Sequence, residues 1–122
     1  MPRIIHFDFT AEDPQRAQRF FQTVFGWKFE KWDDESMEYW MATTGSDTEP
    51  GINGGLSRRK PGVVGFLNTI QVSSVDEYIE KIQENGGEII KKFSVPGVGY
   101  IAHFFDTEKN ILGIIEYNKN AK

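Results

Sequence analysis

The chain has 122 residues, contains no cysteine, and carries a formal net charge of −4 with a pI near 5.2. This length predicts a single domain that buries a hydrophobic core without disulfides, and the acidic balance argues against nucleic acid as the main partner. No apolar run is long enough to span a membrane, and the N-terminus lacks a basic-then-apolar leader pattern. We therefore expect a soluble, cytoplasmic protein.

The chain opens with a predicted strand of alternating character. Ile5, Phe7 and Phe9 alternate with His6 and Asp8. Because side chains alternate between the two faces of a strand, the apolar residues should lie on one face and the two ionisable groups on the other. Function is expected on the polar face.

A helix is predicted directly after this strand. Asp13 is a good N-cap, Pro14 suits the first helical turn, and Gly26 is free to adopt the positive φ that ends a helix. One face of the helix is apolar at helical spacing, through Ala17, Phe20, Phe21, Val24 and Phe25.

The remainder of the first half predicts three further strands, over residues 27–32, 39–43 and 52–58. A charged turn covers residues 33–36, a polar loop covers 45–51, and a linker covers 60–62. The fourth strand contains the pair Gly54-Gly55, which indicates either a bulge or a close approach of a ligand to the backbone.

The second half repeats this order. A strand is expected over residues 65–72, and Ser74 followed by Glu77 forms a capping box that begins a helix. That helix ends at Asn85-Gly86-Gly87, and strands follow over residues 88–93, 100–105 and 111–117. A turn at 96–99 and a tight loop at 106–110 separate these strands.

The residues that begin and end the predicted elements recur in the two halves at a constant offset of 61 residues. The helix N-caps are Asp13 and Ser74, the glycines that end the helices are Gly26 and Gly87, and the third strands begin at Tyr39 and Tyr100. We therefore predict one domain made of two repeats, residues 1–60 and 63–118. A half of this size cannot cover both faces of its sheet alone. Pairing of the halves through their polar faces would enclose a cavity and leave the helices outside.

Four stretches of the chain resemble the vicinal oxygen chelate superfamily, which includes glyoxalase I, bleomycin-resistance proteins and extradiol dioxygenases. In order, they are FDFTAEDPQRAQRFFQTVFGWKF, GINGGL, VDEYIEKIQENGGEI and VPGVGYIAHFFDTEKNILGIIE. The similarity is greatest to its small glyoxalase-related members. It implies an α+β fold in which two βαβββ modules form a barrel-like, curved mixed sheet with the helices outside. In catalytic members it also implies a divalent metal that chelates two neighbouring oxygens of the substrate.

In metal-dependent relatives, the ligands come from the first and last strands of each module. The resemblance assigns His6 and Glu116 to two of these positions, whereas the 61-residue offset places Leu67 and Gly55, which cannot coordinate through a side chain, at the other two. A catalytic divalent site normally needs three protein ligands. The third is expected from Asp8, Thr69 or His103. The resemblance thus implies an incomplete site for Ni, Zn, Co, Mn or Fe, and the alternative is that no cofactor binds.

Other interpretations of these residues remain open. His6 and Glu116 are alternatively a hydrogen-bonded pair across the cavity without an ion, and such a pair can serve as general acid or base. Glu116 is alternatively a solvated carboxylate at a sheet edge, and His103 an ordinary surface or packing residue. Tyr39 and Tyr100 are expected to line the cavity, which suits a flat organic ligand.

Three functions follow as hypotheses. The first is an enzyme that acts on a small oxygenated substrate, a lyase or isomerase related to lactoylglutathione lyase. The second is a non-catalytic protein that binds a small molecule, as bleomycin-resistance proteins do. The third is a subunit whose role is protein association. The resemblance also implies a homodimer, and the fold alone does not assign a reaction.

Overall fold

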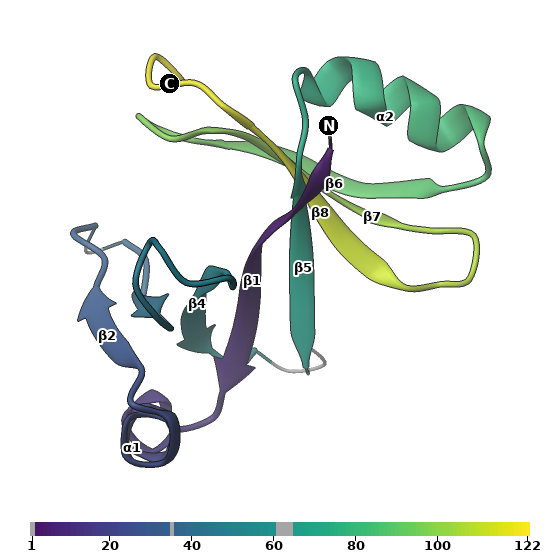
Figure 1. The fold of residues 1–122 in the computed structure, drawn as a ribbon. Helices are drawn as coiled ribbons and strands as arrows, with labels where there is room; N and C mark the ends of the chain where they lie inside the picture. The colour runs from purple at the N-terminus through teal and green to yellow at the C-terminus, as the bar shows by residue number, and fades with distance from the viewer. Residues whose placement is uncertain (1, 35, 61–64) are drawn as a thin grey trace. The chain divides into compact units, whose positions relative to one another are not determined.

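The computed structural model describes residues 2–34, 36–60 and 65–122. The predicted turn residue Glu35, the linker residues Pro61 and Gly62, and the predicted start of the second module at residue 63 lie outside the described residues. The elements follow one another as strand, helix and three strands, twice over (Figure 1). The predicted order of elements is therefore confirmed. Among the described residues, no helix combines the length and apolar character needed to cross a membrane.

The chain divides into two compact units, one comprising His6–Phe66 and the other comprising Leu67–Lys122 together with the residues up to Ile5. The first group of elements is β1 (Arg3–Ala11), α1 (Pro14–Phe25), β2 (Lys28–Lys31), β3 (Tyr39–Thr43) and β4 (Asn53–Arg58). The second group is β5 (Phe66–Gln71), α2 (Val75–Glu84), β6 (Glu88–Val95), β7 (Gly99–Phe105) and β8 (Ile111–Tyr117).

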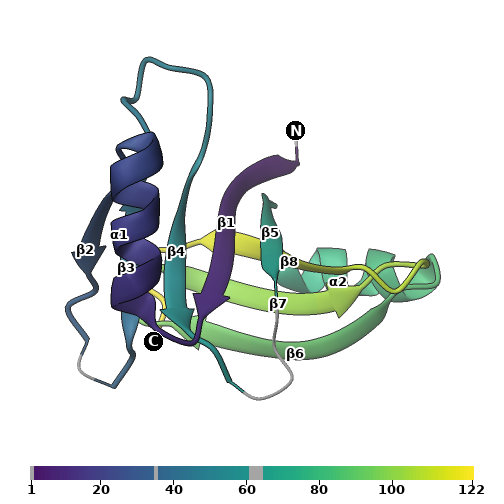
Figure 2. The same cartoon turned by 90° about the horizontal axis from the view of Figure 1, so that it is seen from below.

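In the unit His6–Phe66, the strands pair in the order β2-β3-β4-β1. β1 runs parallel to β4, whereas the β3–β4 and β2–β3 pairs are antiparallel. α1 packs on β2 and β4 and lies over one face of this sheet (Figure 2). The core beneath it consists of the buried side chains of Phe7, Phe9, Trp40 and Leu56.

α1 begins and ends where the sequence predicts. The carboxylate of Asp13 accepts a hydrogen bond from the amide of Arg16 at 3.1 Å, and Pro14 occupies the first helical position. Gly26 ends the helix in the left-handed conformation, with φ of 74°. These local preferences act before any tertiary contact forms, which explains why the limits are readable from the sequence.

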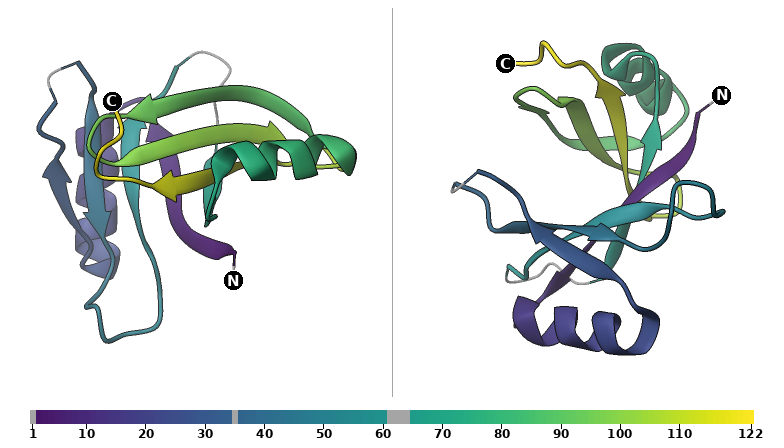
Figure 3. Two further views of the ribbon diagram at one scale, coloured as in Figure 1. Left: turned by 90° about the horizontal axis from the view of Figure 1, so that it is seen from above. Right: turned by 60° about the vertical axis from the view of Figure 1, so that its left-hand side comes forward.

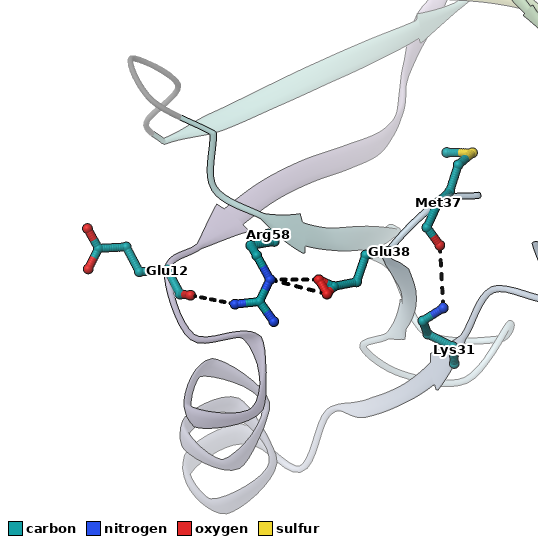
Figure 4. Close-up of polar contacts among 5 residues, drawn as sticks. All are labelled: Glu12, Lys31, Met37, Glu38 and Arg58. Atoms are coloured by element: carbon teal, nitrogen blue, oxygen red, sulfur yellow. Dashed lines mark hydrogen bonds and ion pairs between the residues drawn. The ribbon is translucent and has the colours of Figure 1, made fainter. Parts of the chain in front are cut away.

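An ion pair in the same unit connects β4 with the residue that precedes β3 (Figure 4). The Nε of Arg58 donates to Glu38 Oε1 at 2.6 Å, and its Nη1 donates to the carbonyl oxygen of Glu12 at 3.0 Å. The hydrogen bond from Arg58 lowers the pKa of Glu38 and, reciprocally, raises the pKa of Arg58. Both side chains are largely exposed, so the pair contributes little to stability.

In the other unit, the strands pair in the order β5-β8-β7-β6. β5 runs parallel to β8, and the β7–β8 and β6–β7 pairs are antiparallel. α2 contacts β6, β7 and β8 and lies along the sheet (Figure 3). Its buried core consists of Val72, Val75, Ala102, Phe104 and Ile114. Each unit thus repeats one design, in which a helix covers one face of a four-stranded mixed sheet.

The predicted N-cap at Ser74 and the predicted tight loop of this unit are both confirmed. The hydroxyl of Ser74 accepts a hydrogen bond from the amide of Glu77 at 3.2 Å. In the loop before β8, Asp106 Oδ1 accepts hydrogen bonds from the amides of Glu108 and Asn110, at 2.8 and 2.9 Å. The Asn110 side chain also donates to Asp106 Oδ2 at 3.0 Å. These bonds lower the pKa of Asp106.

Candidate functional site

Asp8 and Tyr39 form a hydrogen bond that crosses a whole strand of their sheet. The Tyr39 hydroxyl, from β3, donates to Asp8 Oδ1, on β1, at 2.7 Å. β4 lies between these strands, and its Gly55 is paired with Asp8 on one side and with Met41 on the other. A Cβ atom at residue 55 would lie 1.7 Å from the Tyr39 oxygen. Glycine at this position is therefore what lets the tyrosine reach Asp8.

His6 completes a triangle of polar side chains. Its Nε2 lies 3.2 Å from Asp8 Oδ1 and 3.1 Å from the Tyr39 oxygen. An ionised carboxylate only accepts hydrogen bonds, and the one hydroxyl proton of Tyr39 is already donated to Asp8. Nε2 must therefore carry the proton that it shares with these oxygens, so a neutral His6 ring presents Nδ1 as an acceptor. We refer to these three residues as the His6–Asp8–Tyr39 triangle.

The triangle lies on the sheet face that is turned away from α1. Phe7 and Phe9, which alternate with His6 and Asp8 along β1, are buried in the core under the helix. The side chains of His6 and Asp8 are 30% and 36% exposed. The predicted separation of apolar and ionisable side chains along the described strand is confirmed, and the polar group that results is accessible to a ligand.

A second group of predicted cavity residues converges in the other unit. A Cβ atom at Gly113 would lie 3.0 Å from Thr69 Oγ1, 3.3 Å from Leu67 and 3.4 Å from the ring of His103. Thr69 is buried, with 5% exposure, and the His103 ring contacts Phe93 at a centroid distance of 5.3 Å. Leu67, Thr69 and His103 are thus brought together around a glycine, although none of them contributes a carboxylate.

The strand register corrects the offset between the two halves. Asp8 is paired with Gly55 in the first unit, and Thr69 is paired with Gly113 in the second. Gly113, and not Glu116, is therefore the counterpart of Gly55. The 61-residue offset is wrong for the last strand because the connections before it are shorter in the second half. Sequence reasoning missed Gly113. Gly113 is identified by the parallel pairing of the first and last strands of its half. The residue opposite Thr69 has to be found from the strand register of the second half, and not by adding the offset to Gly55.

Glu116 lies on the opposite face of its sheet from Gly113. Its Oε1 accepts a hydrogen bond from the amide of Val75, the first residue of α2, at 3.0 Å. Ile114, two residues earlier on β8, is buried against the same helix. A carboxylate at a helix N-terminus satisfies a free amide and interacts favourably with the helix dipole. Glu116 therefore has a structural partner, and its catalytic or metal-binding role stays a prediction.

Tyr100 differs from Tyr39 in the face that it occupies. It packs against the core under α2 with Ala102 and Phe104, and it is paired with Glu116 on β8. Tyr39 points away from its helix, toward Asp8. The predicted equivalence of the two tyrosines is wrong, because a shift of one residue along a strand reverses the face to which a side chain points.

Comparison with known proteins agrees with this architecture. Residues 3–45 match the family described as Bleomycin resistance protein-like N-terminal. A hypothetical protein from Bacillus halodurans C-125 is 16% identical with a TM-score of 0.70, over 99% of this chain and 98% of that chain. Methylmalonyl-CoA epimerase from Mycobacterium tuberculosis is 13% identical with a TM-score of 0.69, over 94% and 87% of the two chains.

The predicted resemblance to the vicinal oxygen chelate superfamily is confirmed. A structure of methylmalonyl-CoA epimerase in complex with methylmalonyl-CoA and NH4+ is 15% identical, with a TM-score of 0.67 over 96% and 95% of the two chains. At these identities the likeness shows the fold. The glyoxalase/bleomycin-resistance fold, with two βαβββ modules, is thereby shown for this chain. A search of curated proteins found no match.

The resemblance implies a divalent metal, so we asked whether the His, Asp and Glu side chains of this chain are placed to hold one. Among residues 2–34, 36–60 and 65–122, no group of three or more His, Asp or Glu side chains is placed to hold a metal ion. The triangle supplies two such side chains, His6 and Asp8, whereas a catalytic site needs three. The described donor set does not fit a complete site, and we derive no chemical step through a metal.

Proposed function

We propose that this chain binds, and acts on, a small oxygen-bearing organic molecule at the His6–Asp8–Tyr39 triangle. The observation that supports the proposal is the hydrogen-bonded group itself, assembled from β1 and β3 across a glycine of β4. Polar side chains brought together on a sheet face forgo the stability that apolar packing would provide, and a few convergent polar groups are typical of ligand sites.

The chemistry of the triangle favours ligands that carry hydroxyl or enol groups. Asp8 has a second carboxylate oxygen, and the neutral His6 ring has Nδ1, both of which accept hydrogen bonds from such groups. In an isomerase or lyase, the Nδ1 atom of His6 is also suited to take a proton from the substrate, while Asp8 orients the ring through Nε2. The epimerase solved with methylmalonyl-CoA supports an acyl compound with neighbouring oxygens as the first class to test.

A second candidate function is sequestration of a small molecule without chemical change. The match of residues 3–45 to a bleomycin-resistance-like family favours this alternative. In that case the triangle orients the ligand by hydrogen bonds, and no proton is transferred. The two functions share the same residues and differ only in whether the bound compound is altered.

Thermal-shift and calorimetric measurements with a panel of 2-oxo acids, hydroxy acids and acyl-CoA thioesters test the proposal. A bound compound should raise the Tm of the native protein, and His6→Ala and Tyr39→Phe should remove that increase. Gln22→Ala, at an exposed position of α1, serves as the control. Equal binding by all four proteins would refute the proposed site. NMR of the bound compound then separates turnover from sequestration.

Whether the protein binds a divalent metal ion is tested on protein purified without chelator. Elemental analysis and a thermal-shift series with Ni²⁺, Zn²⁺, Co²⁺, Mn²⁺ and Fe²⁺, with EDTA as control, detect specific binding through a rise in Tm. A rise that is lost in His6→Ala would show that the ion binds at the triangle and that His6 is one of its ligands. The cytoplasmic location, the homodimer and the module limits at 1–60 and 63–118 stay predictions.

A further inference from the structure

Arg59 is held against β1 by one edge of its guanidinium. Its Nε donates a hydrogen bond to Thr10 Oγ1 at 3.3 Å, and its Nη2 donates to the Thr10 carbonyl oxygen at 3.1 Å. The backbone amide of Arg59 donates to the Ala11 carbonyl oxygen at 2.8 Å, which continues the pairing of β4 with β1 by one residue. The side chain is half-buried. Arg59 is therefore fixed in position, although it follows the last residue of its strand.

The opposite edge of this guanidinium has no hydrogen-bond partner among the described residues. A guanidinium carries five N–H groups, and Thr10 accepts from Nε and from one N–H of Nη2. Nη1 and Nη2 still present a fork of two parallel N–H bonds, which is the geometry that binds both oxygens of a carboxylate. No ion pair in the described part of the chain includes Arg59. A half-buried cation of this kind is stabilised when a ligand supplies the anion.

Arg59 lies on the same sheet face as the triangle. Thr10 follows Asp8 by two residues on β1, and side chains at this spacing point to one face. Phe9, the residue between them, is buried in the core under α1. A two-residue step along a strand covers about 6.6 Å, so Thr10 and the arginine bound to it lie on the order of 7 Å from Asp8. A molecule of a few carbon atoms can bridge this interval, because each of its two hydrogen bonds covers about 2.9 Å.

We propose that Arg59 is the acid-binding residue of the triangle, and that the ligand is a small hydroxy acid. The assignment rests on the proposed function, because Arg59 here adds a second contact to the same ligand. The hydroxyl or enol group of the ligand donates to Asp8 or to Nδ1 of His6, and its carboxylate accepts two hydrogen bonds from the fork of Arg59. Asp8 repels an acid group at the triangle itself, so the arginine also decides which way round the ligand binds.

Arg58, the preceding residue, provides a matched contrast. Its Nε donates to the carboxylate of Glu38 and its Nη1 donates to the Glu12 carbonyl oxygen (Figure 4), and its side chain is 51% exposed. Its charge is already paired, whereas the charge of Arg59 is not paired within the described residues. A substitution of Arg58 therefore removes an arginine from the same segment without removing the proposed acid-binding fork.

Three probes of similar size test the proposal on the full chain by NMR titration and calorimetry. Lactate carries both groups, lactamide lacks the charge, and propanoate lacks the hydroxyl. The native protein should bind lactate most tightly, and Arg59→Gln should weaken that binding about tenfold to a hundredfold, because a charge-assisted bidentate contact is lost. Lactamide should bind equally well to the native protein and to Arg59→Gln. Arg58→Gln should bind lactate as the native protein does.

A purely structural role of Arg59 would give a different result. Loss of the hydrogen bonds to Thr10 would then lower the Tm and weaken the binding of lactate and lactamide alike, which would overturn the acid-binding role. The proposal instead requires a loss confined to the acids. Arg59→Lys retains the charge without the fork, so it should recover only part of the affinity that Arg59→Gln loses. Circular dichroism confirms that each variant is folded.

Failure of the acid-binding role can be told apart from failure of the proposed function. If Arg59→Gln binds lactate as the native protein does while His6→Ala does not bind it, the arginine has no role and the triangle remains the site. If lactate binding depends on Arg59 but is unchanged in His6→Ala, the proposed function is refuted, and the shared ligand with it. If none of the three probes shifts a resonance of the native protein at millimolar concentration, the hydroxy-acid assignment is overturned.

Discussion

Tyr39 and Gly55 are placed so that the phenol of one occupies the space that a side chain on the other would need. A Cβ atom at residue 55 would lie 1.7 Å from the Tyr39 oxygen and 2.0 Å from its Cζ. The hydroxyl then continues to Asp8 on the next strand. The polar triangle therefore depends on a residue without a side chain, and this dependence can be measured.

We predict that Gly55→Ala displaces the Tyr39 ring and breaks its hydrogen bond to Asp8. The loss of a hydrogen bond to a charged group costs about 1.5–3 kcal/mol, and the gain from replacing glycine in a strand returns about 0.5–1 kcal/mol. The net loss of unfolding free energy should be about 1–2 kcal/mol in urea denaturation. Gly45→Ala, whose Cβ would have the flexible Glu49 side chain as its nearest neighbour at 3.4 Å, should be close to neutral.

A double-mutant cycle separates displacement of the ring from other effects of a residue-55 side chain. In a Tyr39→Ala background, the ring that Gly55→Ala would displace is gone, so the second substitution should cost little. If Gly55→Ala is as costly without the tyrosine as with it, the relationship between these residues is not the reason for the glycine.

Tyr39→Phe should lower the unfolding free energy by about 1.5–3 kcal/mol, because Asp8 loses its charge-assisted hydrogen-bond donor. The ring and its packing stay in place, so the effect reports on the hydroxyl alone. Urea denaturation measures the change, and ligand titration measures the accompanying loss of affinity. Unchanged stability together with unchanged ligand affinity would contradict the importance of the triangle.

Glu116 should act on stability through the start of α2. Glu116→Ala removes the acceptor for the Val75 amide and should cost about 1 kcal/mol, as other losses of helix caps do. Glu116→Gln keeps an acceptor and loses only the charge, so it should cost about 0.3–1 kcal/mol. Thermal unfolding measures both. A normal Tm accompanied by loss of metal or ligand binding would instead support the catalytic role predicted from the resemblance.

The loop before β8 should make stability sensitive to acid. Asn110 and the amide of Glu108 hold the pKa of Asp106 below its ordinary value in the folded state. The stability contributed by this carboxylate is present above the unfolded-state pKa and is lost as the pH falls through the lower folded-state pKa. In Asp106→Asn, the free energy of unfolding should therefore fall less steeply as the pH is lowered than it does in the native protein.

A matched control exists for the acid prediction. Glu84→Gln changes an exposed carboxylate at the end of α2 and should leave the acid limb as it is in the native protein. Asn110→Ala, which removes the side-chain donor that contributes most to the lowered pKa, should have an effect like that of Asp106→Asn. A profile unaltered by both loop variants would refute the role of this turn.

The local features of the chain are predictable because they depend on neighbours in sequence. Asp13 and Ser74 cap their helices as expected, Gly26 adopts a positive φ, and Asp106 with Asn110 forms the tight loop. Each of these rests on the hydrogen bonds or backbone freedom of residues a few positions apart. The sheet faces on which Tyr100 and Glu116 lie could not be predicted in this way. They depend on strand register, and a constant offset of 61 fails because the connections in the two halves differ in length.

By itself, the sequence determined that His6 and Asp8 share a face of β1 and that Phe7 and Phe9 share the other, because the pleat of a strand alternates its side chains regardless of what lies beside it. The tertiary structure decided the rest. The pairing of β3 with β4 and of β4 with β1 brings Tyr39 over Gly55 to Asp8, across a separation of 31 residues. Strand register is a long-range property, and a slip of one residue would turn the tyrosine to the opposite face.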